Sequence, residues 1–139
     1  MKCELHAIGS PVAADREAIA APLRAYNLGH VPTLAIQPLV IALRDEHGHT
    51  IGGLWGETGL DWLHVDLLAV PESLRGQDIG TALMQRAEAM ARDRGCIGAW
   101  LDTFAFQARG FYEKLGYSVF GEIPDYPVGG ARYFLRKRF

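Results

Sequence analysis

A short loop with arginine and glycine residues precedes a helical pattern, and this combination is typical of phosphate binding. Arg75, Gly76 and Gly80 lie within SLRGQDIG, at residues 73–80. The first backbone N–H groups of a helix have no intrahelical partner and attract anions, and glycine lets an anion approach the main chain closely. Arg75 would add a fixed positive charge. The loop therefore predicts an anion site, although a glycine turn that simply enters a helix could have the same sequence.

Asp78 places a carboxylate in the middle of this predicted site. The side chain can cap the helix by accepting a hydrogen bond from the N–H of Thr81, which is worth about 1 kcal/mol and would compete with a phosphate. Alternatively, it can turn outward and leave the N–H groups free. Because like charges repel in a partly wet site, we expect the outward orientation, with the carboxylate held by an arginine such as Arg75.

A histidine and an aspartate two residues apart are the candidates for a general base. His64 and Asp66 lie in HVDLLAV, and side chains at i and i+2 share one face of a strand. A carboxylate in so apolar a strand must be paired or must hold its proton unusually tightly. The alternative is that Asp66 only pairs with an arginine or with His64. A second pair, His47 and His49, lies at a hairpin tip with no third ligand nearby, so we expect no metal site.

The rest of the sequence supplies the elements that would position these groups. Apolar alternation bounded by turn residues predicts strands, and apolar residues at helical spacing predict helices. The expected strands are 2–8, 38–45, 50–57, 61–70, 97–106, 117–123 and 131–138, and the expected helices are 10–29, 78–94 and 107–115. This order predicts the α/β (α+β) class, with a single mixed, mostly antiparallel sheet of about seven strands flanked by helices. We expect one domain that spans residues 1–139.

Composition limits the classes of protein to which this chain can belong. The net charge is −2 and both signs are spread along the 139 residues, which argues against nucleic-acid binding. No stretch approaches the roughly 20 apolar residues of a membrane span, and the N-terminus lacks the apolar core of a secretory signal. Cys3 and Cys96 have no CxxC spacing and fit free thiols in a reducing compartment. We therefore expect a cytoplasmic protein without a membrane partner.

Two stretches of the sequence match motifs of one family. The pattern Arg/Gln-x-x-Gly-x-Gly/Ala, preceded by an L-x-V strand end, falls on Leu68, Val70, Arg75, Gln77, Asp78 and Gly80. The pattern Ala-x-x-x-Tyr-x-x-x-Gly-Tyr/Phe falls on Ala108, Tyr112, Gly116 and Tyr117. With the order of elements, these motifs resemble the GNAT superfamily of acetyl-coenzyme A-dependent N-acetyltransferases over nearly the whole chain. The sequence departs from the family at Asp78, where the family usually has glycine.

The resemblance implies how coenzyme A would bind. In that family the strand before the first motif splays from the next parallel strand, here 61–70 and 97–103, and the pantetheine arm enters the gap. The first motif would cradle the pyrophosphate, and a backbone N–H near Leu68 or Ala69 would polarise the thioester carbonyl. Tyr112 would act as general acid toward the coenzyme sulfur; the alternative is a tyrosine packed in the core. The implied coenzyme contacts are Leu68, Ala69, Val70, Arg75, Gly76, Gln77, Asp78, Gly80, Thr81 and Tyr112.

The expected function is transfer of the acetyl group of acetyl-CoA directly to a primary amine of a small molecule. The candidate catalytic residues are Tyr112, Asp66 and His64. The acceptor would be recognised by segment 27–36 and by the loops near 103–107 and 124–130, with Trp55, Trp62, Phe104, Phe106 and Tyr126 as candidate walls. Members of the family often pair through their C-terminal strands, which implies a homodimer through residues 117–138.

Three other functions fit the same sequence. The chain could be a coenzyme A-binding sensor or partner-binding domain with lost or residual catalysis. It could acetylate a protein or peptide amine. An unrelated nucleotide-binding α/β domain would instead bind ATP or NAD tightly, without preference for coenzyme A.

Overall fold

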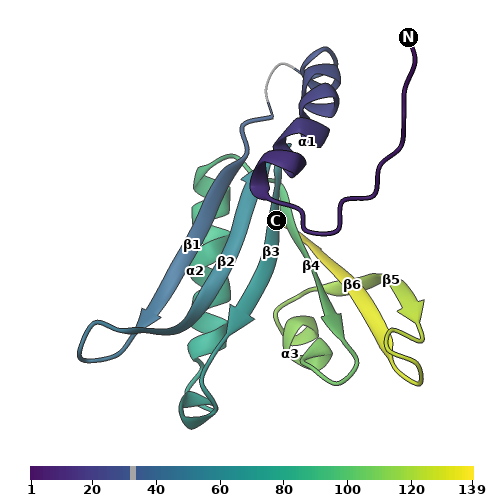
Figure 1. Cartoon of the computed structure of the whole chain (residues 1–139). Helices are drawn as coiled ribbons and strands as arrows, with labels where there is room; N and C mark the ends of the chain where they lie inside the picture. Colours follow the sequence, from purple (N-terminus) through teal and green to yellow (C-terminus); the bar gives the residue numbers. More distant parts are fainter. Residues whose placement is uncertain (32–33) are drawn as a thin grey trace. The chain divides into compact units, whose positions relative to one another are not determined.

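The computed structural model describes every residue except 32 and 33, and it divides into two units, Met1–Leu34 and Ala35–Phe139 (Figure 1). The first unit contains an irregular N-terminal segment and helix α1, Ala13–Leu28. The predicted helix is confirmed: Val12 N–H donates to the Asp15 carboxylate at 2.8 Å, and Gly29 follows the last turn.

The strand predicted at residues 2–8 is wrong. These residues have no regular structure and are exposed. Alternation alone cannot form a strand, because a strand needs a hydrogen-bonded partner, and the described part of the first unit contains no second strand.

The second unit, described throughout its length, is a mixed six-stranded sheet with the order β1-β2-β3-β4-β6-β5. Neighbouring strands are antiparallel except β3 and β4, which are parallel. The predicted class is therefore confirmed, with six strands rather than about seven. The strands are β1 (Gln37–Arg44), β2 (Thr50–Gly59), β3 (Trp62–Ala69), β4 (Gly98–Phe104), β5 (Ser118–Pro124) and β6 (Ala131–Arg138).

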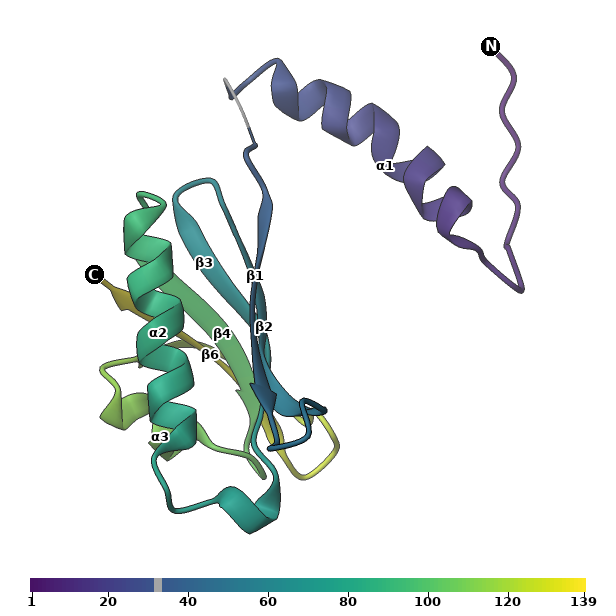
Figure 2. The same ribbon diagram turned by 90° about the vertical axis from the view of Figure 1, so that its left-hand side faces the viewer.

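Helix α2, Ile79–Asp93, packs against one face of the sheet (Figure 2). Ala87 and Ala91 are fully buried, and their small side chains let the helix backbone approach the strands. A short helix, α3 (Arg109–Lys114), follows β4. The described helices include none long and apolar enough to cross a membrane. The apolar core between α2, α3 and the sheet includes Leu39, Leu54, Leu63, Val65, Met84, Ala99, Leu101, Tyr112, Tyr117 and Leu135.

A buried ionic cluster joins α2 to β6. The Glu88 carboxylate, on a side chain that is almost fully buried, accepts hydrogen bonds from the Tyr117 hydroxyl at 3.0 Å and from Lys137 Nζ at 2.7 Å. Burial, and then the negative charge of Glu88, raise the pKa of Tyr117, so the hydroxyl keeps the proton that it donates. The cluster satisfies a charge that would otherwise be costly to bury.

The parallel pair β3 and β4 is joined over only half of its length. Residues 62–65 of β3 pair with residues 98–101 of β4, and beyond Val65 and Leu101 the strands diverge, as Figure 1 shows. A β-bulge lies at the same point: Val65 is opposite Gly56 and Leu67 is opposite Trp55, so Asp66 is the extra residue of β3. Gly56 has no room for a side chain, because a Cβ would lie 2.5 Å from the His64 carbonyl oxygen. The predicted splayed pair is thus confirmed, and the bulge coincides with the point of separation.

Candidate active site

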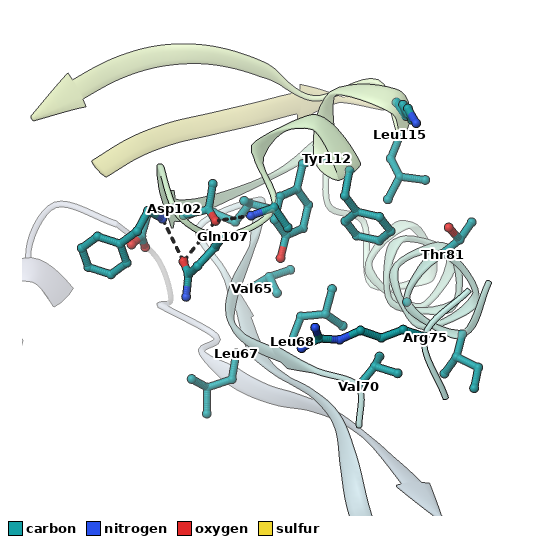
Figure 3. Close-up of a pocket in the computed structure, with 18 of the residues that line it drawn as sticks. Val65, Leu67, Leu68, Val70, Arg75, Thr81, Asp102, Gln107, Tyr112 and Leu115 are labelled. Atoms are coloured by element: carbon teal, nitrogen blue, oxygen red, sulfur yellow. Dashed lines mark hydrogen bonds between the residues drawn. The ribbon is translucent and has the colours of Figure 1, made fainter. Parts of the chain in front are cut away.

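A cleft of about 960 Å³ lies where β3 and β4 diverge. The open end of β3 forms one side of the cleft, the end of β4 and helix α3 form another, and the first turn of α2 borders it as well (Figure 3). From residue 66 onward, the edge of β3 that faces β4 has no strand partner. Its backbone groups are therefore available to an extended ligand, in the manner of an added strand.

The first turn of α2 leaves its backbone donors free. Asp78 precedes the helix in the left-handed conformation, with φ 59° and ψ 21°, and its side chain makes no capping hydrogen bond. The first helical hydrogen bond runs from the Ala82 N–H to the Asp78 carbonyl at 3.0 Å, so the N–H groups of Ile79, Gly80 and Thr81 precede it. The carboxylate is exposed, and no ion pair joins it to Arg75 or to any other described residue. The expected Asp78–Arg75 pair is therefore wrong, whereas the side chain does leave the donors free.

Gly80 joins the first turn of α2 to α3. A Cβ at this position would lie 3.2 Å from Cζ of Phe111, so the glycine allows the aromatic ring to lie directly against the turn. Phe111 is the neighbour of Tyr112, and their rings meet edge to face with centroids 5.1 Å apart. The first turn of α2 and Tyr112 are thus connected through Phe111.

Tyr112 presents a hydroxyl to the cleft from an otherwise buried ring. The residue is 8% exposed, and Figure 3 shows its oxygen directed into the cavity above Val65. No hydrogen bond joins this hydroxyl to a described residue. Burial, and then the negative charge of Asp102, raise the pKa of Tyr112. The phenol therefore stays protonated at neutral pH and can donate to a group in the cleft.

The structure separates the two candidate bases. Asp66, the bulge residue, is exposed and lines the cleft, and among the described residues it has no ion-pair or hydrogen-bond partner. His64 stacks on Trp100, with centroids 3.9 Å apart and planes 12° apart, and does not line the cleft. Its Nε2 is buried without a hydrogen-bond partner among the described residues. The alternative in which Asp66 only pairs with His64 or an arginine is wrong, because the carboxylate of this bulge residue is exposed and unpaired among the described residues.

A second carboxylate reaches the cleft from β4. Asp102 forms an ion pair with Arg132 of β6, whose guanidinium donates from both Nε and Nη2. Nη1 of the same arginine donates to the Tyr126 hydroxyl at 3.1 Å. Gln107 completes this side: its Oε1 accepts hydrogen bonds from the Phe104 N–H at 2.8 Å and from Thr103 Oγ1 at 3.1 Å. Asp102 lies close enough to Tyr112 for its negative charge to act on the tyrosine hydroxyl.

The chain matches the model of the acetyltransferase (GNAT) family over residues 14–117. It is 43% identical to a blasticidin-S acetyltransferase of Streptomyces morookaense, over 79% of this chain and 84% of that protein. It is 41% identical to an acetyltransferase of Agrobacterium fabrum, over 88% of this chain and 90% of that protein. A crystal structure from Agrobacterium tumefaciens superposes with a TM-score of 0.90 at 38% identity, covering 100% of both chains. The chain belongs to the GNAT acetyltransferase family.

The cleft of this GNAT acetyltransferase contains most of the residues predicted from the two motifs. Ala69 and Gln77 are the two predicted coenzyme contacts that do not line it: Ala69 is opposite Gly53 in β2, and Gln77 is exposed in the loop. The predicted residues that line the cleft are Leu68, Val70, Arg75, Gly76, Asp78, Gly80, Thr81, Tyr112 and Asp66.

Of the five aromatic residues predicted to line the acceptor site, some lie at the cleft and others do not. Phe104 and Phe106 line the cleft, and Tyr126 lies beside them, whereas Trp55 and Trp62 are not part of its lining. Within the predicted acceptor segment 27–36, residues 32 and 33 lie outside the described part of the chain.

The expected absence of a metal site concerns His47 and His49. His49 Nδ1 lies 3.5 Å from the Asp45 carboxylate at the β1–β2 hairpin. Among the residues that the structure describes, no three histidine, cysteine or acidic side chains are grouped as metal ligands.

Sequence reasoning missed three charged residues of the GNAT cleft, Asp102, Lys114 and Arg132. Asp102 carried a usable signal, because it interrupts the apolar strand AWLDTF just as Asp66 interrupts VDLLAV. The other two reach the cleft only through tertiary packing, and their spacing in the sequence gives no such indication.

Proposed function

We propose that this GNAT acetyltransferase moves the acetyl group of acetyl-CoA directly to a primary amine of a small molecule. The observation that carries the proposal is the cleft itself, which combines an unpaired strand edge, a set of free helix N–H groups and an accessible, protonated tyrosine. Each of these meets a different part of acetyl-CoA, which is a substrate here.

The coenzyme would lie along β3 and end at α2. The pantetheine arm is an extended chain with amide groups, and it matches the unpaired edge of residues 66–69. The pyrophosphate is an anion, and it matches the free N–H groups of Gly80 and Thr81 together with the Arg75 guanidinium. This arrangement would leave the thioester near Tyr112.

The transfer needs a neutral amine and a protonated leaving group. The amine lone pair attacks the thioester carbonyl carbon, forming the C–N bond and a tetrahedral intermediate. When the intermediate collapses, the C–S bond breaks, and the coenzyme sulfur takes the proton of the Tyr112 hydroxyl. The nitrogen gives up one proton, so that the products are an amide and free coenzyme A. Tyr112 regains its proton from solvent.

Asp66 is our proposed acceptor of the amine proton. It is the candidate base that lines the cleft, and its carboxylate is exposed without a described partner, so it is free to accept the proton that the nitrogen loses after attack and to pass it to solvent. The amine that attacks has already lost its ammonium proton to solvent. His64 is held against Trp100 outside the cleft lining, and we give it no step in this proposal.

A small-molecule acceptor is supported by the relatives rather than by the cleft alone. The 43% identical relative is named for the acetylation of blasticidin S, a small molecule. The test is an acetyl-CoA assay with blasticidin S, aminoglycosides, polyamines, amino acids and a histone-like peptide, followed by thiol release and by mass spectrometry of the acetylated product.

The outcomes of this assay separate the candidate functions. Acetylation of a small amine supports the proposal. Acetylation of the peptide alone would instead favour a protein acceptor. Saturable coenzyme A binding without turnover of any acceptor would favour a sensor, and tight ATP or NAD binding without coenzyme A binding would contradict the family-based function.

A further inference from the structure

An aromatic hollow of about 570 Å³ adjoins the cleft. We call it the ring subsite; it is lined by Phe104, Phe106, Asp125, Tyr126, Pro127 and Val128. Phe104 and Phe106 also line the cleft, so the two spaces adjoin at these two rings. The subsite comes from the end of β4 and the β5–β6 loop, apart from the first turn of α2.

Three aromatic rings of the ring subsite pack against one another. Phe104 and Phe106 stack with centroids 5.3 Å apart and planes only 10° apart. Tyr126 lies against Phe104 at 5.4 Å with a 30° tilt. Phe106 is 72% exposed, and a large aromatic side chain on a loop is costly to leave in water. The free ring surface is therefore suited to stacking with a planar group of a ligand.

Arg132 contacts the Phe104 and Tyr126 rings and pairs with Asp102, two residues before Phe104. Its guanidinium is paired with Asp102 and bonded to the Tyr126 hydroxyl, and it lies over the Phe104 ring at 5.3 Å and the Tyr126 ring at 5.1 Å. The geometry of Tyr126 is thus set by a hydrogen bond and a cation–π contact. Asp102, which is not part of the subsite lining, is paired with Arg132, and the carboxylate of the lining, Asp125, accepts a hydrogen bond from the Gly129 N–H at 3.1 Å.

The ring subsite lies close to Asp102 and, through it, to Tyr112. Asp102 and Phe104 are two residues apart on β4 and both line the cleft, and Asp102 interacts electrostatically with Tyr112. A ligand that stacks at Phe104 and Phe106 can therefore extend an arm past Asp102 toward Tyr112.

We infer that the acceptor carries a planar aromatic or heteroaromatic ring that binds in the ring subsite, with its amine on a short arm. This inference rests on the proposed function for the direction of the arm, whereas ring binding itself can be measured without catalysis. Stacking on flat walls favours a flat ring over a puckered ring of the same size.

Benzylamine and cyclohexylmethylamine form a matched pair of probes, because they share the amine arm and differ in the flatness of the ring. Each is titrated into the coenzyme A-saturated protein and followed by NMR chemical shifts. We expect benzylamine to bind about fivefold more tightly. Phe106→Ala should abolish this preference and Phe106→Trp should retain it. Phe120→Ala, which removes an exposed aromatic ring on β5, is the control and should leave the preference unchanged.

Equal affinity for the two amines, no binding of either, or a preference that survives Phe106→Ala would overturn the inference. The failure of the proposed function looks different. If aliphatic amines are acetylated as well as aromatic ones, the transferase function stands and the ring subsite is wrong. If benzylamine binds as described but no acetyl group is transferred to any acceptor, the ring subsite stands and the proposed function is wrong.

Discussion

The two halves of the β3–β4 pair have opposite physical characters. In the paired half, residues 62–65 and 98–101, the side chains directed at α2 are buried, and Leu63 and Ala99 have no exposed surface. In the open half, residues 66–69 and 102–104, Asp66 and Leu67 are exposed and the strands do not meet. A single bulge residue separates the two. Strand β3 thus belongs to the core over its first half and has an unpaired edge over its second half, and the change is made locally at Asp66.

Substituting one leucine in each half should change the free energy of unfolding by very different amounts. Leu63→Ala should lower the free energy of unfolding by about 3 kcal/mol, because it leaves a cavity in a fully buried site. Leu67→Ala, at a side chain that is 60% exposed, should change it by less than about 0.5 kcal/mol. Urea unfolding of both variants measures the difference. Similar losses from the two substitutions would show that the open half is also part of the core.

Two buried tyrosines, Tyr112 and Tyr117, should differ in whether their substitution changes kcat or stability. Tyr112→Phe should lower kcat about a hundredfold, the range expected for a lost general acid, while the Kd for acetyl-CoA changes little. Tyr117→Phe, which removes the hydrogen bond to Glu88, should instead lower the free energy of unfolding by about 1 kcal/mol and leave kcat unchanged. Steady-state kinetics and thermal unfolding of both variants separate catalysis from packing. A normal kcat for Tyr112→Phe would remove this residue from the mechanism.

The pH dependence of the reaction follows from the same tyrosine. Burial, with Asp102, raises the pKa of Tyr112 above its ordinary value of 10.0, so the protonated acid persists up to at least that pH. The contribution of Tyr112 to the free energy of unfolding is complete below its unfolded-state pKa and is lost as pH rises through its folded-state pKa. We expect kcat to have no alkaline decline below about pH 10 that depends on Tyr112. A decline near neutral pH that disappears in Tyr112→Phe would contradict this.

The smallest expected effect concerns Asp78. Glycine adopts the left-handed conformation at lower cost, so Asp78→Gly should stabilise the fold by up to about 1 kcal/mol, and loss of the carboxylate should tighten acetyl-CoA binding about threefold. Asp61→Gly, at φ 72° in the β2–β3 turn, is the matched control and should affect stability alone. Calorimetric titration of each variant with acetyl-CoA gives the two dissociation constants. If Asp78→Gly leaves the acetyl-CoA Kd unchanged within about twofold, Asp78 is a bystander.

The sequence predicted the β1–β3 hairpins and helix α2 because turn chemistry and apolar periodicity are local signals. The bulge at Asp66 was missed, since it depends on the register between β2 and β3 and on the lack of space at Gly56. Glu88 is buried on α2 although it is charged, and no local pattern indicates this because its partner, Lys137, is 49 positions away in the sequence. The same limitation hid Arg132, whose partner Asp102 lies on another strand.

Gly80 and Phe111 join the two parts of the cleft that we propose to bind the coenzyme. Their contact holds the first turn of α2, proposed to bind the pyrophosphate, directly against α3, which carries Tyr112. If acetyl-CoA binds as proposed, a larger residue at position 80 would therefore disturb the phosphate site and the tyrosine together, because its Cβ would meet the Phe111 ring.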